Sequence, residues 1–321
     1  MTTLPPFGID PIFVGRVWGF RDLRPWYDRV ADDDPIGEVW LTGDDCRVAT
    51  GPHAGKRLAA LFAEEHEALL GPRARSSASP LLLKTLFARE KLSVQVHPDD
   101  AMAQKYGEPR GKTECWYALA AEPGAKVALG VKPGVTLVQI EEEIRAGTLE
   151  TSLNAVAVAA GDTLYVDAGT IHAIWPGSIL LETQQNCDLT YRMFDYGRPR
   201  ELHIAKSLEA TKLVTRAGKI APQQLADRTV LIDAEYFDME RIAPAESRTS
   251  ASLRGGEAPG LAYLFAASGA GRLTGPEFAP VDLPPRGVVA VPAAAPDFVL
   301  EDAGSAEGRL DLIRIAPHGP E

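Results

Sequence analysis

The sequence predicts a mainly β protein with two jelly-roll barrels and helical insertions in its N-terminal half. Beyond about residue 225, short apolar runs typical of strands follow one another at regular spacing, separated by Gly- and Pro-containing turns. In addition, AGDTLYVDAGTIHAI (160–174) and RGVVAVPAAAPDFVLE (286–301) share a frame of turn, strand, turn and strand. We therefore expect one domain over residues 1–225 and a second, related domain over 226–321.

The first domain should mix strands with helices. EVWLT (38–42) and RVAT (47–50) are typical of strands, and the turn GDD (43–45) separates them. Four stretches carry the apolar spacing or the end signals of helices and are predicted as insertions, at about 54–71, 99–107, 136–147 and 201–213. Asp99 and Thr136 are suitable N-caps for two of these helices.

Composition and charge exclude several classes of protein. The 321 residues carry a formal net charge of -11 and no cluster of Lys and Arg, so nucleic-acid binding is not expected. No run of 18 apolar residues suggests a membrane span. The N-terminus lacks the basic start and apolar run of a signal peptide, and the three cysteines fit no metal-finger spacing. We expect a cytoplasmic protein with free thiols.

The segment KLSVQVHPDD (91–100) has the two-residue period of a strand with one apolar and one polar face. Ser93, Gln95 and His97 share the polar face, and Pro98 should end the strand because it cannot donate to a sheet. Gln95 and His97 are separated by ~7 Å along the strand, so their side chains can converge on one ion. A solvated face is the ordinary explanation for this segment alone.

Two further segments strengthen the case for a metal site. Glu114 lies in KTECWY (112–117), and His172 follows the DAGT turn at the start of a predicted strand. One amide, one carboxylate and two imidazoles make a suitable ligand set for zinc, although the set also admits iron, manganese or cobalt. In the second copy of the repeated frame, Pro296 or Asp297 stands where the first copy has His172, so the C-terminal domain is expected to bind no metal.

The segment LETQQNCDLTYRMFD (181–195) is the other stretch that could contribute side chains to a functional site. At a period of two, one face carries six polar residues, namely Glu182, Gln184, Asn186, Asp188, Thr190 and Arg192. The run is long compared with a mean strand of ~5–6 residues, so we expect a bend near residues 185–187. An exposed edge strand is the alternative explanation of the same pattern.

KLSVQVHPDD, GKTECWY, DAGTIHAI and LETQQNCDLTYRMFDYGR resemble, in order and spacing, the motifs of the type I mannose-6-phosphate isomerases (phosphomannose isomerases). The resemblance is to the short bacterial form of this cupin family. It implies two cupin-like jelly-roll barrels, of which the first binds one Zn2+ per chain. By resemblance, the zinc ligands would be Gln95, His97, Glu114 and His172. The same comparison implies catalytic roles for Arg192, Lys112, Asp188 and Glu182, and substrate binding by Ser93 and Lys84.

The implied reaction interconverts D-mannose 6-phosphate and D-fructose 6-phosphate through an enediol intermediate. Such an isomerisation needs a base near C1 and C2 and an electrophile near their oxygens. The sequence leaves the base open among Asp188, Glu182, Lys112 and a metal-bound water. Two other functions stay open as well, another metal-dependent cupin enzyme and a non-catalytic sugar-phosphate-binding cupin. The partner in each case is a small molecule, and the sequence leaves the oligomeric state open.

Overall fold

The computed structural model describes residues 3–72, 74, 76–253 and 260–318. It is mainly β with a few short helices, which confirms the predicted fold class. The chain divides into two compact units, each formed by segments that are distant in the sequence. Unit 1 comprises Met1–Ile12, Trp40–Leu81 and Ala221–Glu321, and unit 2 comprises Phe13–Val39 and Leu82–Ile220.

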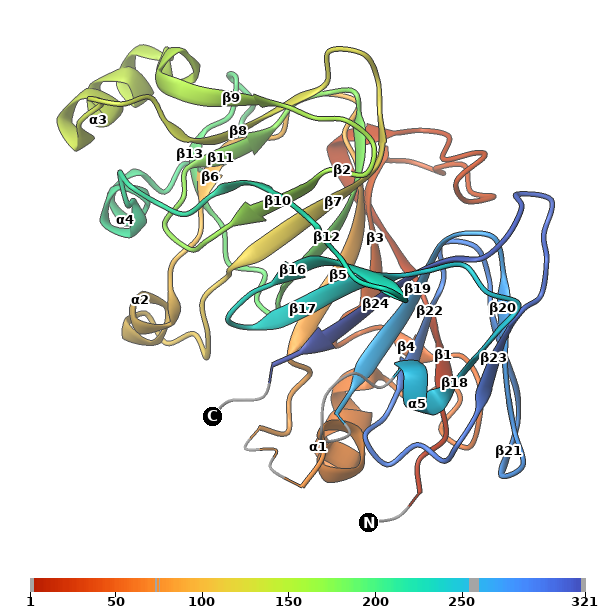
Figure 1. Ribbon diagram of the computed structural model, residues 1–321. Coiled ribbons are helices and arrows are strands. Elements are labelled where there is room, and N and C mark those ends of the chain that lie inside the picture. Colours follow the sequence, from red (N-terminus) through yellow and green to blue (C-terminus); the bar gives the residue numbers. More distant parts are fainter. Residues whose placement is uncertain (1–2, 73, 75, 254–259, 319–321) are drawn as a thin grey trace. The chain divides into compact units, whose positions relative to one another are not determined.

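Unit 2 contains most of a seven-stranded sheet and a five-stranded one (Figure 1). In spatial order, the larger sheet consists of β14 (Gly218–Ile220), β10 (Thr163–Val166), β7 (Glu114–Ala121), β12 (Ser178–Gln185), β5 (Leu81–Phe87), β3 (Ile36–Thr42) and β2 (Ile12–Phe20). The smaller sheet consists of β13 (Tyr191–Phe194), β6 (Val94–Val96), β11 (His172–Ile174), β8 (Lys126–Val131) and β9 (Leu153–Ala157).

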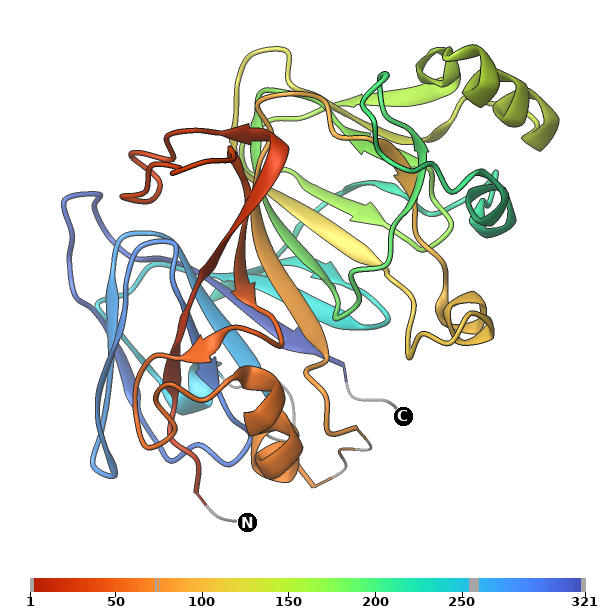
Figure 2. The ribbon, with the colours of Figure 1, turned by 180° about the vertical axis from the view of Figure 1, so that it is seen from behind.

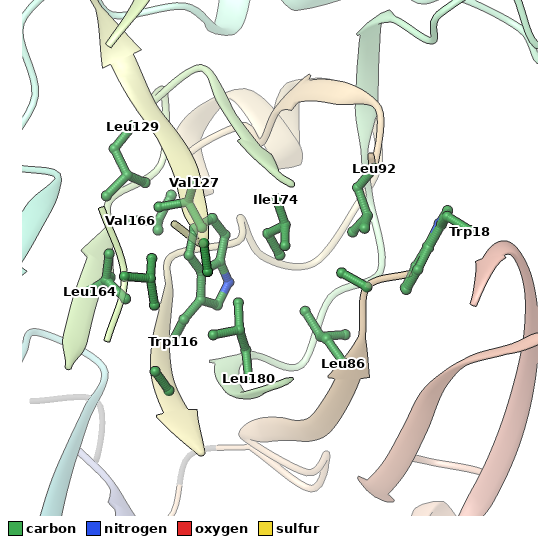
Figure 3. Packing of buried hydrophobic residues seen from close by; sticks show 14 residues of the cluster. Trp18, Leu86, Leu92, Trp116, Val127, Leu129, Leu164, Val166, Ile174 and Leu180 are labelled. Carbon is green, nitrogen blue, oxygen red and sulfur yellow. The ribbon is translucent and has the colours of Figure 1, made fainter. Parts of the chain in front are cut away.

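Apolar side chains from both sheets of unit 2 meet in one core (Figure 3). Trp116, Leu164 and Leu180 come from the seven-stranded sheet, whereas Val127 and Ile174 come from the five-stranded one. This arrangement is the double-sheet packing expected of a jelly roll. Glu114, His172 and Glu182 lie two residues from the core residues Trp116, Ile174 and Leu180 on the same strands, so they share the inner face with the core and adjoin it.

Unit 1 also has two sheets. Its eight-stranded sheet consists, in spatial order, of β15 (Gln223–Gln224), β16 (Arg228–Asp233), β17 (Phe237–Ile242), β24 (Asp311–Pro317), β19 (Ala262–Ser268), β22 (Val288–Val291), β1 (Phe7–Asp10) and β4 (Arg47–Val48). Its four-stranded sheet consists of β18 (Ser247–Thr249), β23 (Val299–Asp302), β20 (Gly271–Gly275) and β21 (Phe278–Leu283). Apolar residues of both sheets, including Leu264 and Leu273, again form one core.

The compact units differ from the single boundary near residue 225 that the sequence suggests. Phe7 of β1 pairs with Ala290 of β22, and Ile9 of β1 pairs with Val48 of β4, so N-terminal strands complete the C-terminal sheet (Figure 2). The helix over residues 58–70 also belongs to unit 1. Pairing between strands so distant in the chain leaves no local periodicity, and a sequence pattern therefore cannot reveal it.

Helices lie within all four expected ranges, as α1 (Leu58–Leu70), α2 (Asp100–Lys105), α3 (Leu137–Ala146) and α4 (Ile204–Ala210). Asp99 caps α2 by accepting from the N–H of Met102 at 3.0 Å, and Thr136 caps α3 by accepting from Gln139 at 3.2 Å. Two short helical elements were not expected, the 3-10 turn η1 (Leu149–Ser152) and the single helical turn α5 (Ser250–Leu253). The expectation of strands and turns alone beyond residue 225 was wrong at α5, because four residues are too few to show a helical period.

Among the residues that the structure describes, no helix is both long and apolar enough to cross a membrane.

Leu164 offers a test of the core of unit 2. Its side chain is fully buried beside Trp116 between the two sheets (Figure 3). Leu164→Ala should lower the free energy of unfolding by about 2–5 kcal/mol, because it removes buried methyl groups and leaves a cavity. Chemical denaturation measures this loss. Val138→Ala, at a position 67% exposed on α3, is the control and should change stability by less than about 0.5 kcal/mol.

Candidate active site

Three buried side chains in unit 2 can hold a metal ion. They are His97, Glu114 and His172, and one possible ligand atom from each lies within 4.8 Å of the others. His97 follows the end of β6, Glu114 opens β7 and His172 opens β11. Strand pairing brings these segments together, because His172 pairs with Gln95 of β6, and Glu114 lies between Val166 of β10 and Gln184 of β12.

The backbone holds both imidazoles so that Nε2 faces Glu114. The Nδ1 of His97 lies 2.9 Å from the carbonyl oxygen of Leu189, and the Nδ1 of His172 lies 2.9 Å from that of Thr170. A carbonyl can only accept, so each Nδ1 carries the proton and each Nε2 keeps its lone pair. These two Nε2 atoms lie 3.5 Å and 3.4 Å from the carboxylate oxygens of Glu114. Hydrogen bonds of this kind orient histidine ligands in metal sites.

Burial keeps both histidines neutral. It lowers the pKa of His97 well below its usual 6.5, and the charge of Lys112 lowers it further. Burial likewise lowers the pKa of His172 to about 4, although its hydrogen bond to Thr170 opposes that shift. At neutral pH both Nε2 atoms are therefore unprotonated, that of His97 without a hydrogen bond among the described residues and that of His172 as the acceptor from the amide of Gln95.

The burial and the chemical type of the donor atoms are those of metal ligands. The Nε2 of His97 and Oε1 of Glu114 are buried and make no hydrogen bond among the described residues. A buried polar atom without a partner costs about 1–3 kcal/mol, and more for a charged group. Two imidazole nitrogens and a carboxylate at this spacing match the nitrogen and oxygen ligands that zinc prefers.

Gln95 lies beside these three residues. Its Nε2 is 3.2 Å from the Nε2 of His172, and its Oε1 is 3.3 Å from the hydroxyl of Ser93. The amide nitrogen cannot bind a metal ion, so ligation by Gln95 requires a half-turn of the amide that brings Oε1 to the His172 side.

Two buried lysines neutralise the carboxylates around the candidate metal site. The Nζ of Lys112 lies 3.2 Å from Glu114, and the Nζ of Lys84 lies 3.1 Å from Asp188 and 3.7 Å from Glu182. Burial alone would lower the pKa of Lys112, but the charges of Glu114 and Glu182 raise it above its ordinary value. Burial and the charge of Glu114 raise the pKa of Glu182.

A cavity of about 440 Å3 lies next to these residues. Its lining includes seven residues for which the sequence predicts a catalytic, binding or ligand role, namely Lys84, Ser93, Gln95, Lys112, Glu182, Asp188 and Arg192, and also Thr190 of the predicted polar face. Glu114 and His172 lie one side chain behind the cavity wall, because Lys112 contacts Glu114 and Gln95 contacts His172. The volume suits a small molecule such as a sugar phosphate.

Several residues of the cavity lining were not expected from the sequence. Arg16 of β2 and Glu38 of β3 form an ion pair at 2.8 Å, and Trp18 of β2 lies beside them in the lining. Arg200 also lines the cavity, and it contacts Asp195 at 2.6 Å and 2.7 Å. Residues of β2 and β3 lie far from the recognisable motifs, so only the strand pairing reveals their place in the site.

The predicted polar face over residues 182–192 is divided between the two sheets. β12 ends at Gln185 and β13 begins at Tyr191, which confirms the expected break near residues 185–187. Arg192 pairs in register with Gln95 of β6. Its guanidinium donates to the carbonyl oxygen of Glu201 at 2.9 Å, while its buried Nε makes no hydrogen bond. Within the described part of the chain, no ion pair involves Arg192, and burial lowers its pKa, helped by Arg200.

Residues 20–130 match the family model "Phosphomannose isomerase type I, catalytic domain". The mannose-6-phosphate isomerase of Streptococcus mutans is 36% identical over 236 residues, which cover 69% of this chain and 73% of that protein. The structure of the mannose 6-phosphate isomerase from Bacillus subtilis has a TM-score of 0.84 at 30% identity, over 97% of this chain and 99% of that one.

A more distant structure, described as a mannose 6-phosphate isomerase bound with zinc and yttrium, has a TM-score of 0.74 at 17% identity. It covers 98% of this chain and 100% of that one, and at this identity it speaks for the fold alone. The family model and the identity to the S. mutans relative show the family as well as the fold. The chain therefore belongs to the type I phosphomannose isomerase family of enzymes.

Proposed function

We propose that this protein is a zinc-dependent isomerase that interconverts D-mannose 6-phosphate and D-fructose 6-phosphate. The observation that supports this most directly is the set of buried, converging donor atoms of His97, Glu114 and His172 behind a cavity with cationic side chains. Gln95 would be the fourth ligand after its amide turns. The names of the relatives point to the same substrate.

The proposed metal would act as a Lewis acid that polarises the oxygens at C1 and C2 of the sugar. The chain's own residues would bind and orient the rest of the substrate. Lys112 stays charged, because the neighbouring carboxylates raise its pKa, and its Nζ can stabilise negative charge that develops on an enediol oxygen. Ser93 and Lys84 would contact the substrate from the cavity wall.

Proton transfer between C1 and C2 needs a group that can both accept and release a proton. Lys112 is poorly suited as the base because its raised pKa keeps it protonated. Glu182 is better suited, because burial raises its pKa towards the working range, and Trp116 Nε1 binds its Oε2 at 3.1 Å. The other oxygen, Oε1, would then carry the proton. Asp188, whose Oδ1 accepts from Lys84 at 3.1 Å, is the second candidate.

An assay that couples fructose 6-phosphate formation to a measurable product tests this function. The purified protein should turn over mannose 6-phosphate, lose activity with a chelator and recover it with Zn2+. Metal analysis should find one ion per chain, because the proposed ligands all lie in unit 2 and unit 1 is expected to hold none. Bound metal without turnover would favour a non-catalytic sugar-phosphate-binding cupin, and a requirement for iron and oxygen would favour another cupin enzyme.

We also infer a cytoplasmic location. All three cysteines are free, which suits a reducing compartment, and burial raises the pKa of Cys46 to about 11. The substrate class is a soluble sugar phosphate.

A further inference from the structure

Arg192 is held in place from both its backbone and its side chain by residues at the start of α4. Its backbone N–H donates to the Nδ1 of His203 at 3.2 Å, and its backbone carbonyl accepts from the N–H of His203 at 2.8 Å. Its guanidinium donates to the carbonyl oxygen of Glu201. We propose that His203 is a positioning residue that fixes Arg192 at the cavity wall and thereby supports turnover without touching the substrate. This inference rests on the proposed isomerase function.

His203 binds the backbone of β13 on the side where a further strand would otherwise pair. β13 is the edge strand of the five-stranded sheet, with β6 on its inner side. The backbone N–H and carbonyl of Arg192 both point to the outer side, where an edge strand has no neighbour. His203 satisfies both groups, one with its ring and one with its backbone. The register of pairing between β13 and β6 shifts between Arg192 and Phe194. Because pairing with β6 is interrupted there, the hydrogen bonds from His203 matter more for the position of Arg192.

In the part of the chain that the structure describes, the ring of His203 also packs beside the ring of Tyr191, with centroids 6.2 Å apart, but it does not support the end of α4. His203 is the N-cap residue of α4, yet its side chain makes no capping hydrogen bond. Since a backbone N–H can only donate, the Nδ1 that it meets must be unprotonated and Nε2 must carry the proton. The carboxylate of Glu201 lies 4.0 Å from Nε2 and favours that tautomer. This role cannot be recognised from the sequence, because His203 has no recognisable partner within its own segment.

The matched variants are His203→Asn and His203→Leu. Asparagine carries an acceptor, Oδ1, on the same side-chain carbon as Nδ1 of histidine, whereas leucine has a similar size and no acceptor. His203→Leu should lower kcat about tenfold, which corresponds to ~1.4 kcal/mol, while the metal content stays unchanged. His203→Asn should restore most of that loss. Equal kcat values for the two variants would overturn the proposal.

A positioning role through Arg192 also predicts non-additivity. In an Arg192→Lys background, His203→Leu should cause less than about a twofold further loss of kcat, because the group that it positions is already gone. If His203 had a merely structural role, His203→Leu would lower the melting temperature, and its fold-loss of kcat would multiply with that of Arg192→Lys. This outcome would refute the inference. If His203→Leu does not fold, His203→Gln replaces it, since its acceptor lies one carbon farther out. Equal activity of the Asn and Gln variants would then count against the proposal.

The wild-type protein separates this inference from the proposed function. No conversion of mannose 6-phosphate by the wild type would contradict the proposed function itself. Wild-type turnover together with an unimpaired His203→Leu variant would leave that function intact and would contradict only the role of His203.

Discussion

His172→Ala is expected to remove the bound metal and nearly all turnover. Nε2 of His172 is one of three converging donors, and no other imidazole except His97 belongs to the described group. Loss of residues that merely orient a ligand reduces metal affinity by about 10–100-fold, so loss of a ligand should cost at least about 100-fold. Metal analysis after gel filtration, together with the coupled assay, measures both effects. His97→Ala should behave in the same way.

Glu114→Gln tests the charge of the same site. It keeps the shape of the side chain but deletes the only carboxylate of the group, so metal binding should weaken while the chain still folds. His53→Ala, in a turn of unit 1, is the control for removal of a histidine as such and should keep both metal and activity. Full metal occupancy in His97→Ala and His172→Ala would show that the metal binds elsewhere.

The sequence predicted the strand that carries Gln95 and ends just before His97, because an alternating face and a terminating proline are local signals. The candidate metal-binding residues come from three separate segments. Their convergence depends on pairings such as His172 with Gln95, which local periodicity does not contain. The resemblance to a known family supplied that information. It did not reveal the ion pair of Arg16 with Glu38 or the support of Arg192 by His203, since Arg16, Glu38 and His203 lie outside the recognisable motifs.

The break between β12 and β13 shows how local and long-range signals combine. The polar face over residues 182–192 was too long for one strand, and the structure divides it between the two sheets of unit 2. Glu182 therefore reaches the cavity from the larger sheet and Arg192 from the smaller one. Residues that share a face by alternation can thus line one cavity without lying on one strand.

Arg192→Lys should reduce turnover by about 10–100-fold, which corresponds to ~1.4–2.7 kcal/mol of lost transition-state stabilisation. Arg192 has no carboxylate partner among the described residues, and its buried Nε makes no hydrogen bond. A planar guanidinium that is not engaged by a carboxylate of the described residues can pair with two oxygens of the substrate at once. Lysine keeps the charge and loses that geometry. Arg192→Ala should lose more activity than Arg192→Lys, because it removes the charge as well.

Stability separates this catalytic role from a structural one. Arg192 forms one side-chain hydrogen bond in the described structure, to Glu201, so its removal should cost only about 1 kcal/mol of folding stability. Metal content should stay unchanged, because arginine is not a ligand. Arg145→Lys, at an exposed position of α3 paired with Glu141, is the matched control and should keep wild-type kinetics. Near-normal kinetics for the folded fraction of Arg192→Ala, together with a large fall in melting temperature, would assign the arginine to the fold instead of the reaction.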